Sequence, residues 1–241
     1  MFTSLLPGFR HFRTPFTVGA IVAFEWWAIL GERIPKPGQA HGFLQRVYSL
    51  AEFAGRPVVA AAIAFTLYLV GNVLTLKSWQ AMRLVHTLSR VLPAPIFSSE
   101  SIAQLHQLIR KAFDRRGMTD VAELRRVVRE MQAELISIRM HLTANHVDVY
   151  LEHDRLDSEA EFRFNVAVHL VTVWCVLSVL WSPWFFIGFA LTAILYHDGL
   201  ISLRDANAIL VQSVVSGLVT SQVYEREIQR DREHDASAGV A

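Results

Sequence analysis

The feature that most constrains this chain is an uncharged, apolar run of 32 residues, Asn165–Tyr196. A helix needs about 20 apolar residues to cross the roughly 30 Å hydrocarbon core of a bilayer. As a single helix the run would extend about 48 Å, which is too long for one crossing. The motif Trp181–Trp184 (WSPW) lies near its middle and is typical of a turn at the membrane surface. The run therefore predicts a membrane hairpin, with spans at about Phe162–Ser182 and Trp184–Leu200.

Two further apolar stretches lie closer to the N-terminus. Pro57–Leu76 has 20 residues without a charge, and Pro15–Gly31 has 17 residues that include Glu25. A secretory signal peptide is the competing interpretation of the earlier stretch, since Arg10 and Arg13 precede it. That stretch lacks a small-residue cleavage site, and Glu25 would interrupt the apolar region of a signal. We therefore expect two retained N-terminal spans, at 15–31 and 57–76.

The charged residues concentrate between these spans and the hairpin. Residues 77–164 carry 13 basic and 12 acidic side chains. Strand alternation and Asn-Gly or Asp-Gly turns are missing there, so the predicted structure is helical. The expected fold is an all-α membrane protein with about four transmembrane helices. Its expected regions are 1–76 with two spans, 77–161 as a cytoplasmic helical and coiled-coil insertion, 162–200 as the membrane hairpin, and 201–241 as an amphipathic helix with a disordered acidic tail.

The distribution of lysine and arginine sets the expected orientation. Arg10, Arg13 and the basic residues of the central region and the tail fall on one side of the predicted spans, whereas the Trp181–Trp184 turn has none. The loop 32–56 carries four basic residues, which count against this assignment without outweighing it. We therefore expect both termini and the region 77–161 to lie in the cytoplasm.

A heptad pattern is the best-defined periodic signal in the sequence. Neither Gly nor Pro occurs between Met118 and Ser182, so residues 120–161 predict one long helix, with room for a bend near Asn145, that continues into the third span. Two interpretations stay open: the apolar seam packs on a helix of the same chain at about 99–116, or it joins subunits as a coiled coil. The seam consists of Val121, Leu124, Val128, Met131, Leu135, Ile138, Leu142, Val149 and Leu156.

The sequence contains none of the usual motifs of soluble enzymes. GxGxxG, GxxxxGK[ST], GxSxG and HExxH are all absent. The single cysteine, Cys175, excludes an intrachain disulfide and a CxxC zinc site. A net charge of +1 does not indicate nucleic-acid binding. We therefore expect no catalytic residue, no cofactor and no nucleic-acid partner.

Two ionisable residues lie within the predicted spans, Glu25 in the first and His169 in the third. A charge in such a position costs about 3 kcal/mol on insertion scales, so these groups are usually paired, and His169 is the expected partner of Glu25. One interpretation is a proton or ion path. The other, which we favour, is that Glu25 is protonated or lies near the outer interface beside Trp26 and Trp27.

Polar residues gather on the segment that leads into the third span. His146, His153 and Asp157 recur on one helical face, as metal ligands do in helical bundles. A second helix would have to complete the site and offers only His106, so a solvated polar face is favoured and no metal is expected. Nearer the membrane the charged residues form a juxtamembrane collar, expected to clamp neighbouring helices or subunits. The collar comprises Asp154, Arg155, Glu159, Glu161 and Arg163.

The same segment carries a resemblance. Leu151–Arg163 (LEHDRLDSEAEFR) resembles the DR-x-x-x-EAEFR juxtamembrane segment of a group of integral membrane proteins from high-GC Gram-positive bacteria. Leu6–Arg10, Arg13–Pro15 and Val215–Ser221 are similar to the ends of the same proteins. No activity is established for that group. The resemblance therefore implies a location in a bacterial inner membrane and nothing catalytic.

These features predict a non-enzymatic, multi-pass protein of the bacterial inner membrane. It would act as an oligomeric scaffold or as the membrane partner of a cytoplasmic effector. Its expected partners are the lipid bilayer, further copies of the chain and a cytoplasmic protein. Two alternatives stay open: a small ion channel or pore-forming effector that depolarises the membrane in a defence response, and a membrane-embedded enzyme. The sequence names no substrate, ion, partner or subunit number.

Overall fold

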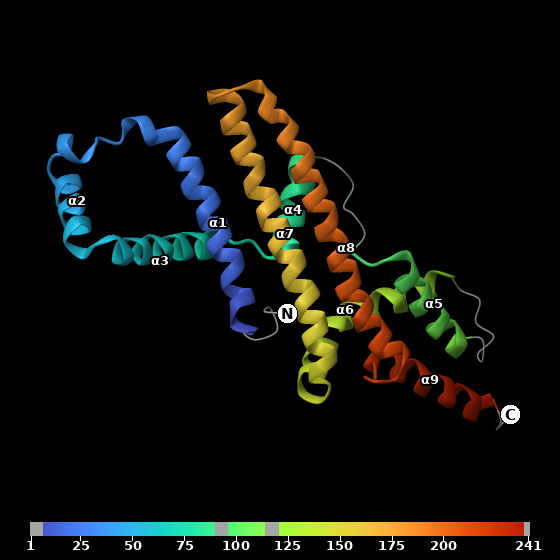
Figure 1. Ribbon diagram of the computed structural model, residues 1–241. Helices are drawn as coiled ribbons and strands as arrows, with labels where there is room; N and C mark the ends of the chain where they lie inside the picture. The colour runs from blue at the N-terminus through green and yellow to red at the C-terminus, as the bar shows by residue number, and fades with distance from the viewer. Residues whose placement is uncertain (1–6, 90–95, 114–120, 239–241) are drawn as a thin grey trace. The chain divides into compact units, whose positions relative to one another are not determined.

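The computed structural model describes residues 7–89, 96–113 and 121–238. Every regular element in these ranges is a helix, and four of the helices are long and apolar enough to cross a membrane. The expected all-α class with four candidate spans is therefore confirmed. The chain forms two compact units: unit 1 comprises 1–93 and 158–199, and unit 2 comprises 94–157 and 200–241. These units do not coincide with the four consecutive regions expected from the sequence, because helices α7 and α8 each contribute to both units (Figure 1).

Unit 1 holds the apolar helices. The hairpin turn expected at Trp181–Trp184 is present, because α7 ends at Leu180 and α8 begins at Gly188. Ser182 caps the short helix between them, with its side chain accepting a hydrogen bond from the Trp184 N–H. The elements are α1 (Pro7–Leu30), η2 (Gly31–Arg33), η3 (Pro37–Gln39), α2 (Phe43–Ala54), α3 (Arg56–Leu74), α4 (Ser78–Ser89), α7 (Val147–Leu180), η5 (Pro183–Ile187) and α8 (Gly188–Val215).

Helix α1 lies alongside α7 and runs in the same direction. Arg13 forms an ion pair with Glu159 at 2.8 Å, and Glu25 accepts a hydrogen bond from Thr172 at 3.2 Å. The two contacts are separated by about the same number of residues on each helix, 12 on α1 and 13 on α7. Equal spacing in the same chain direction requires parallel helices, since each residue advances a helix by about 1.5 Å.

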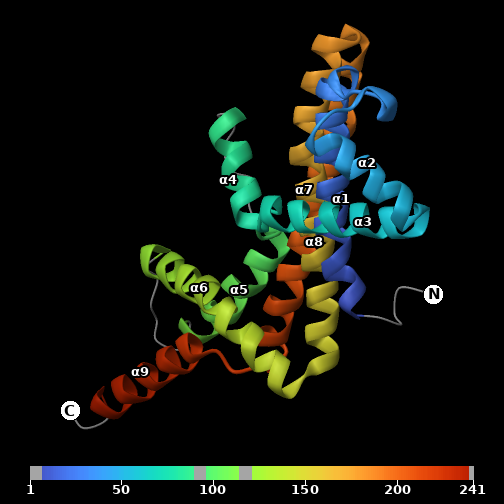
Figure 2. The ribbon, with the colours of Figure 1, turned by 90° about the vertical axis from the view of Figure 1, so that its left-hand side faces the viewer.

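Helix α3 crosses α1 steeply in both ribbon views (Figures 1 and 2). The two backbones touch where they cross, because a Cβ atom added to Gly19 would overlap the carbonyl of Leu67, and one added to Gly71 would overlap the carbonyl of Pro15. The composition of α3 fits a span, but its two close glycine contacts set a crossed arrangement with α1.

Unit 2 consists of α5 (Ser99–Phe113), α6 (Val121–Asn145), α9 (Gln222–Ala238) and the ends of α7 and α8. The heptad positions of α6 that the structure describes face its core, so they pack within the chain. Val149 packs partly against this core, Leu156 is half-buried, and the side chains of Val121 and Leu124 lie outside the described residues. The buried core comprises Leu105, Ile109, Val127, Val128, Met131, Leu135, Ile138, Leu142, Leu210, Val211, Val214, Val219 and Val223.

The single long helix expected over residues 120–161 is not formed. Helix α6 ends at Asn145 and α7 begins at Val147. Arg139 on α6 nevertheless reaches Asp157 on α7 at 3.1 Å. In a straight helix residues 139 and 157 would be about 27 Å apart, so the chain reverses between α6 and α7. Other helices of unit 2 cover the apolar face of α6. Helix α6 therefore belongs to the core of unit 2 and ends before the apolar part of α7 begins.

The C-terminal region also differs from expectation. Helix α8 ends at Val215, and Gly217, with φ +73°, makes the left-handed turn that closes it: the Leu218 N–H donates to the carbonyl of Ser213. The amphipathic helix expected after residue 200 is therefore the second half of α8, and it packs in the core of unit 2. Residues 222–238 form α9, where the sequence analysis expected a disordered acidic tail.

Candidate functional site: the polar contacts of helix α7

The polar side chains of α7 meet different partners in the two units. In unit 1 they contact α1 and the chain segment that follows α3. In unit 2 they contact α6 and the second half of α8. The unit 1 contacts are made by Glu159, Asn165, His169 and Thr172, all on one side of the helix.

Of these residues, Asn165 has the most side-chain hydrogen bonds. Its side chain is 0% exposed. The amide oxygen accepts a hydrogen bond from the Leu76 N–H at 2.7 Å, and the amide nitrogen donates to the Leu76 carbonyl at 2.7 Å and to the Glu161 carbonyl at 2.8 Å. One side chain thus satisfies both backbone groups of the residue that follows α3. This contact fixes the end of the α3 segment onto α7.

Glu25 of α1 and His169 of α7 have separate hydrogen-bond partners. A carboxylate oxygen of Glu25 accepts from Thr172, while His169 Nε2 lies 3.4 Å from the carbonyl of Leu74. A carbonyl only accepts, so Nε2 is the donor. No hydrogen bond or ion pair joins Glu25 to His169 among the described residues, but the Glu25 carboxylate lies close enough to act electrostatically on the His169 imidazole. A transport role for the two groups stays a prediction.

The juxtamembrane collar forms in part as expected, with partners that the sequence did not name. Glu159 pairs with Arg163 at 3.2 Å and with Arg13 of α1. The guanidinium of Arg13 also lies 3.9 Å from the ring centroid of Phe162. Arg155 pairs with Glu152 rather than with Glu159. The remaining members also have partners: Asp154 pairs with Arg139, Arg163 donates to the carbonyl of Asp198, and Glu161 accepts from Asn165 at its backbone carbonyl.

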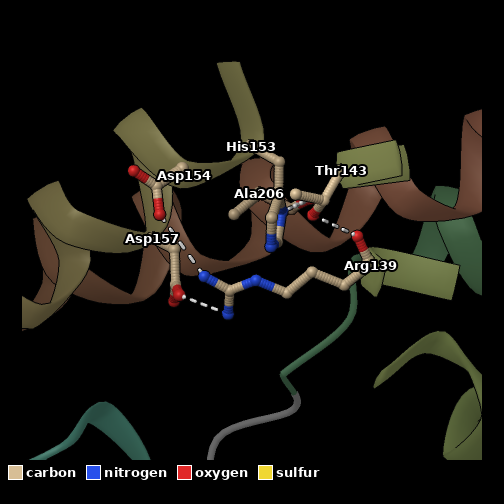
Figure 3. Close-up of polar contacts among 6 residues, drawn as sticks. All are labelled: Arg139, Thr143, His153, Asp154, Asp157 and Ala206. Atoms are coloured by element: carbon tan, nitrogen blue, oxygen red, sulfur yellow. Dashed lines mark hydrogen bonds and ion pairs between the residues drawn. The ribbon is translucent and has the colours of Figure 1, made fainter. Parts of the chain in front are cut away.

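In unit 2, Arg139 holds the reversed α6–α7 pair together. Its guanidinium donates to Asp157 at 3.1 Å and to Asp154 at 3.4 Å (Figure 3). Burial alone would lower the pKa of Arg139, but the charge of Asp157, the neighbouring Tyr150 hydroxyl and the charge of Asp154 outweigh it and raise the pKa. Arg139 is therefore a permanent cation that compensates two carboxylates.

His153 lies beside this cluster and is 3% exposed. Its Nδ1 is 3.0 Å from the carbonyl of Ala206 on α8, so Nδ1 carries the proton and donates (Figure 3). Its Nε2 is buried without a hydrogen-bond partner in the described structure. With His153 engaged by Ala206 and Asp157 by Arg139, the face of His146, His153 and Asp157 is a packing surface. Among the described residues, no three His, Cys, Asp or Glu side chains are placed to hold a metal.

A third carboxylate of unit 2 holds the last helix. Glu134 on α6 accepts hydrogen bonds from the Ser221 hydroxyl at 2.6 Å, the Gln222 N–H at 2.6 Å and the Val223 N–H at 3.3 Å. These N–H groups belong to the first turn of α9, where a negative charge is favoured by the helix dipole. Glu134 therefore starts α9 and ties it to α6.

Sequence reasoning missed three of these residues: Arg139, Glu134 and Asn165. Arg139 and Glu134 act across large sequence separations and belong to no motif, so nothing in the sequence marks them. Asn165 carried a signal, because it is the only Asn or Gln in the run Asn165–Tyr196. An amide in an apolar helix needs partners, and that requirement would have pointed to a contact with another segment.

Comparison with protein-family models, with curated proteins and with solved structures finds no match to this chain. The resemblance of Leu151–Arg163 to a group of bacterial membrane proteins therefore stays a prediction.

Proposed function

We propose that this chain is a non-enzymatic, integral protein of the bacterial inner membrane that acts as an oligomeric scaffold. Unit 1 lies in the bilayer, and unit 2 is presented to a cytoplasmic protein partner. The observation that carries the proposal is the continuity of α7 and α8, each of which contributes to both units without a break. Two of the connections between the units are thus continuous helices, which suits a membrane-anchored scaffold.

The charged groups beside the apolar part of α7 support a structural role. Arg13, Glu159 and Arg163 are used to attach α1 to α7. In unit 2, Asp154 and Asp157 are neutralised by Arg139, and Glu134 caps α9. Charged groups held in this way stabilise the contacts between helices, as is expected in a scaffold protein.

The surface of α3 supports self-association. Only 6% of its apolar stretch is buried within the chain. Val58, Phe65 and Val73 are more than half exposed. Such a surface needs lipid or another protein chain to cover it. We propose that further copies of the chain cover part of it and that lipid covers the rest.

One observation favours a second candidate, a small ion channel. Glu25 is a carboxylate on an apolar helix, and ionisable groups in such positions often line ion paths. Reversible ionisation is needed for transport, and Gln cannot ionise. Glu25→Gln therefore separates the two candidates, because a structural Glu25 tolerates the change and its new amide oxygen still accepts from Thr172.

The test is ion flux in liposomes reconstituted with the full chain, measured beside protein-free liposomes. A scaffold leaves the flux at the protein-free level in the native chain and in Glu25→Gln. Flux above that level in the native chain, lost in a well-folded Glu25→Gln protein, would replace the scaffold by the channel. Chemical cross-linking in the same liposomes tests self-association, and a monomer at all protein-to-lipid ratios would contradict the oligomer.

A further inference from the structure

Helices α2 and α3 enclose two adjoining grooves. Gly55, with φ +79°, separates the helices and lets the chain turn sharply between them. The position of α2 is held by the Tyr48 hydroxyl, which donates to the carbonyl of Pro35 at 2.9 Å. The grooves share Ala51, Val59 and Ile63 in their walls, so one continues into the other.

The first groove is apolar. It has a volume of about 360 Å³, and Thr66 is the one polar residue among the ten that line it. The Thr66 hydroxyl donates to the carbonyl of Ala62, so it needs no hydrogen bond to a ligand. A groove with such walls fits a hydrocarbon chain, because burying apolar surface is the favourable interaction that it offers.

The second groove is larger, about 550 Å³, and carries charge of both signs. Glu52 lies near the end of α2 and Arg56 lies at the start of α3, and both are exposed. Together they present one carboxylate and one guanidinium next to the apolar groove. A ligand that complements them carries one anion and one cation at the head of a hydrocarbon chain.

The bilayer supplies a ligand of this kind. Helix α2 directly precedes α3, which has the composition of a membrane span, so the groove is continuous with the surface that lipid covers. A phosphate group suits the planar donors of Arg56, and a primary ammonium with three N–H donors suits the carboxylate of Glu52. A phosphatidylethanolamine has both groups joined to acyl chains.

We propose that the α2–α3 groove binds one phosphatidylethanolamine molecule. One acyl chain lies along the apolar groove, the phosphate contacts Arg56 and the ammonium contacts Glu52. The inference rests on the membrane location that is part of the proposed function, but not on the scaffold role. The outcome of the liposome flux experiment therefore does not decide it.

The test uses the full chain, purified in mild detergent after mixing with equal amounts of phosphatidylethanolamine, phosphatidylcholine and phosphatidylglycerol. Native mass spectrometry counts the lipids retained by each chain. We expect one retained phosphatidylethanolamine, with a preference of about fivefold over the other two lipids, the size that one exposed ion pair supports. Retention of no lipid, or of the three lipids equally, would overturn the proposal.

Two alanines of α3 provide matched variants. Ala62 lines the apolar groove, whereas its neighbour Ala61 is equally exposed and lines neither groove. Ala62→Phe should fill the groove and abolish retention, and Ala61→Phe, with the same added volume, should leave retention unchanged. Equal retention by the two variants would contradict the groove as the site.

The headgroup contacts are tested on exposed side chains that the fold does not need. Glu52→Gln should remove the preference for phosphatidylethanolamine over phosphatidylcholine while one lipid stays bound. Arg56→Gln should reduce the retention of all three lipids, because each has a phosphate. If Glu52→Gln keeps the preference of the native chain for phosphatidylethanolamine over phosphatidylcholine, the assigned contact between Glu52 and the ammonium group is excluded. This result does not depend on whether Ala62→Phe folds.

Discussion

Asn165 shows how one side chain determines a chain path in this protein. Its amide bonds both the N–H and the carbonyl of Leu76, at a site closed to solvent. Arg139 also determines the chain path, because it forms ion pairs with Asp154 and Asp157 of the following helix. Each residue joins one helix to another segment of the chain, so each substitution should affect more than its local helix.

Asn165→Ala should destabilise unit 1. The variant removes the hydrogen-bond partner of the Leu76 N–H and of the Leu76 carbonyl, which are partly buried, and this should cost about 1 to 3 kcal/mol in total. Thermal unfolding of the purified protein in detergent measures the effect. Asn207→Ala is the matched control, since Asn207 makes a single hydrogen bond to the Ile96 carbonyl in unit 2 and should lose well under half as much. Equal losses would mean that Asn165 does not hold the α3 segment.

Arg139→Gln should destabilise the α6–α7 pair by about 1 to 2 kcal/mol, because it leaves two partly buried carboxylates without a cation. The Arg139 side chain is 38% exposed, and solvent screening keeps the effect at this modest size. Adding Asp154→Asn and Asp157→Asn should recover most of the loss, as expected for groups that interact directly. Chemical denaturation of the native protein, Arg139→Gln, the Asp154→Asn/Asp157→Asn double variant and the triple variant measures the coupling. A triple variant less stable than Arg139→Gln would contradict the assigned ion pairs.

At the scale of elements, the predicted seam of α6 and the predicted length of that helix had different outcomes. The heptad positions of α6 were correctly assigned to a packed seam, and Met131, Leu135 and Ile138 are buried within the chain. The length of that helix was not predicted correctly, because the chain reverses after Asn145 without a Gly or Pro to mark the end of the helix. The stop depends on the tertiary contacts of Arg139 and on the cover over α6, which local sequence signals do not encode.

Leu135→Asp tests the seam. Leu135 is 4% exposed, and a carboxylate placed there loses its hydration, which costs several kcal/mol. Met140 lies on the same helix and is 70% exposed, so Met140→Asp should leave the stability unchanged. Thermal unfolding in detergent should show a large loss for the first variant only. An intrachain seam also predicts that chemical cross-linking gives the same oligomer for Leu135→Asp as for the native chain, and loss of the oligomer in Leu135→Asp but not in Met140→Asp would favour the intersubunit coiled coil.

The arrangement of α3 shows the other limit of sequence reasoning. Its apolar composition predicted a span correctly in length and hydropathy. Its direction relative to α1 depends on Gly19 and Gly71, where the two backbones touch. Glycines in an apolar helix indicate close packing in general, but the partner and the crossing geometry follow only from the folded chain.

At the scale of the whole molecule, α7 and α8 determine the organisation. The sequence predicted the hairpin and the charged segment before it, because both depend on local composition. It predicted an amphipathic helix after residue 200 that lies along the membrane surface or against the bundle, but not that this helix continues α8 and packs in the core formed by α5, α6 and α9. That core joins residues more than 100 positions apart, such as Leu105 and Leu210, which no local pattern connects.

We propose that the apolar helices of unit 1 span a membrane, with the α7–α8 turn outside the cell and Met140 in the cytoplasm. Labelling of cysteines by a membrane-impermeant thiol reagent in right-side-out vesicles tests it most directly. The two reporter positions are Phe186→Cys in the hairpin turn and Met140→Cys in unit 2, both exposed and both placed in a Cys175→Ser background. We expect Phe186→Cys to be labelled in intact vesicles and Met140→Cys to be labelled only after permeabilisation. Labelling of Met140→Cys in intact vesicles, or of neither position before permeabilisation, would contradict it.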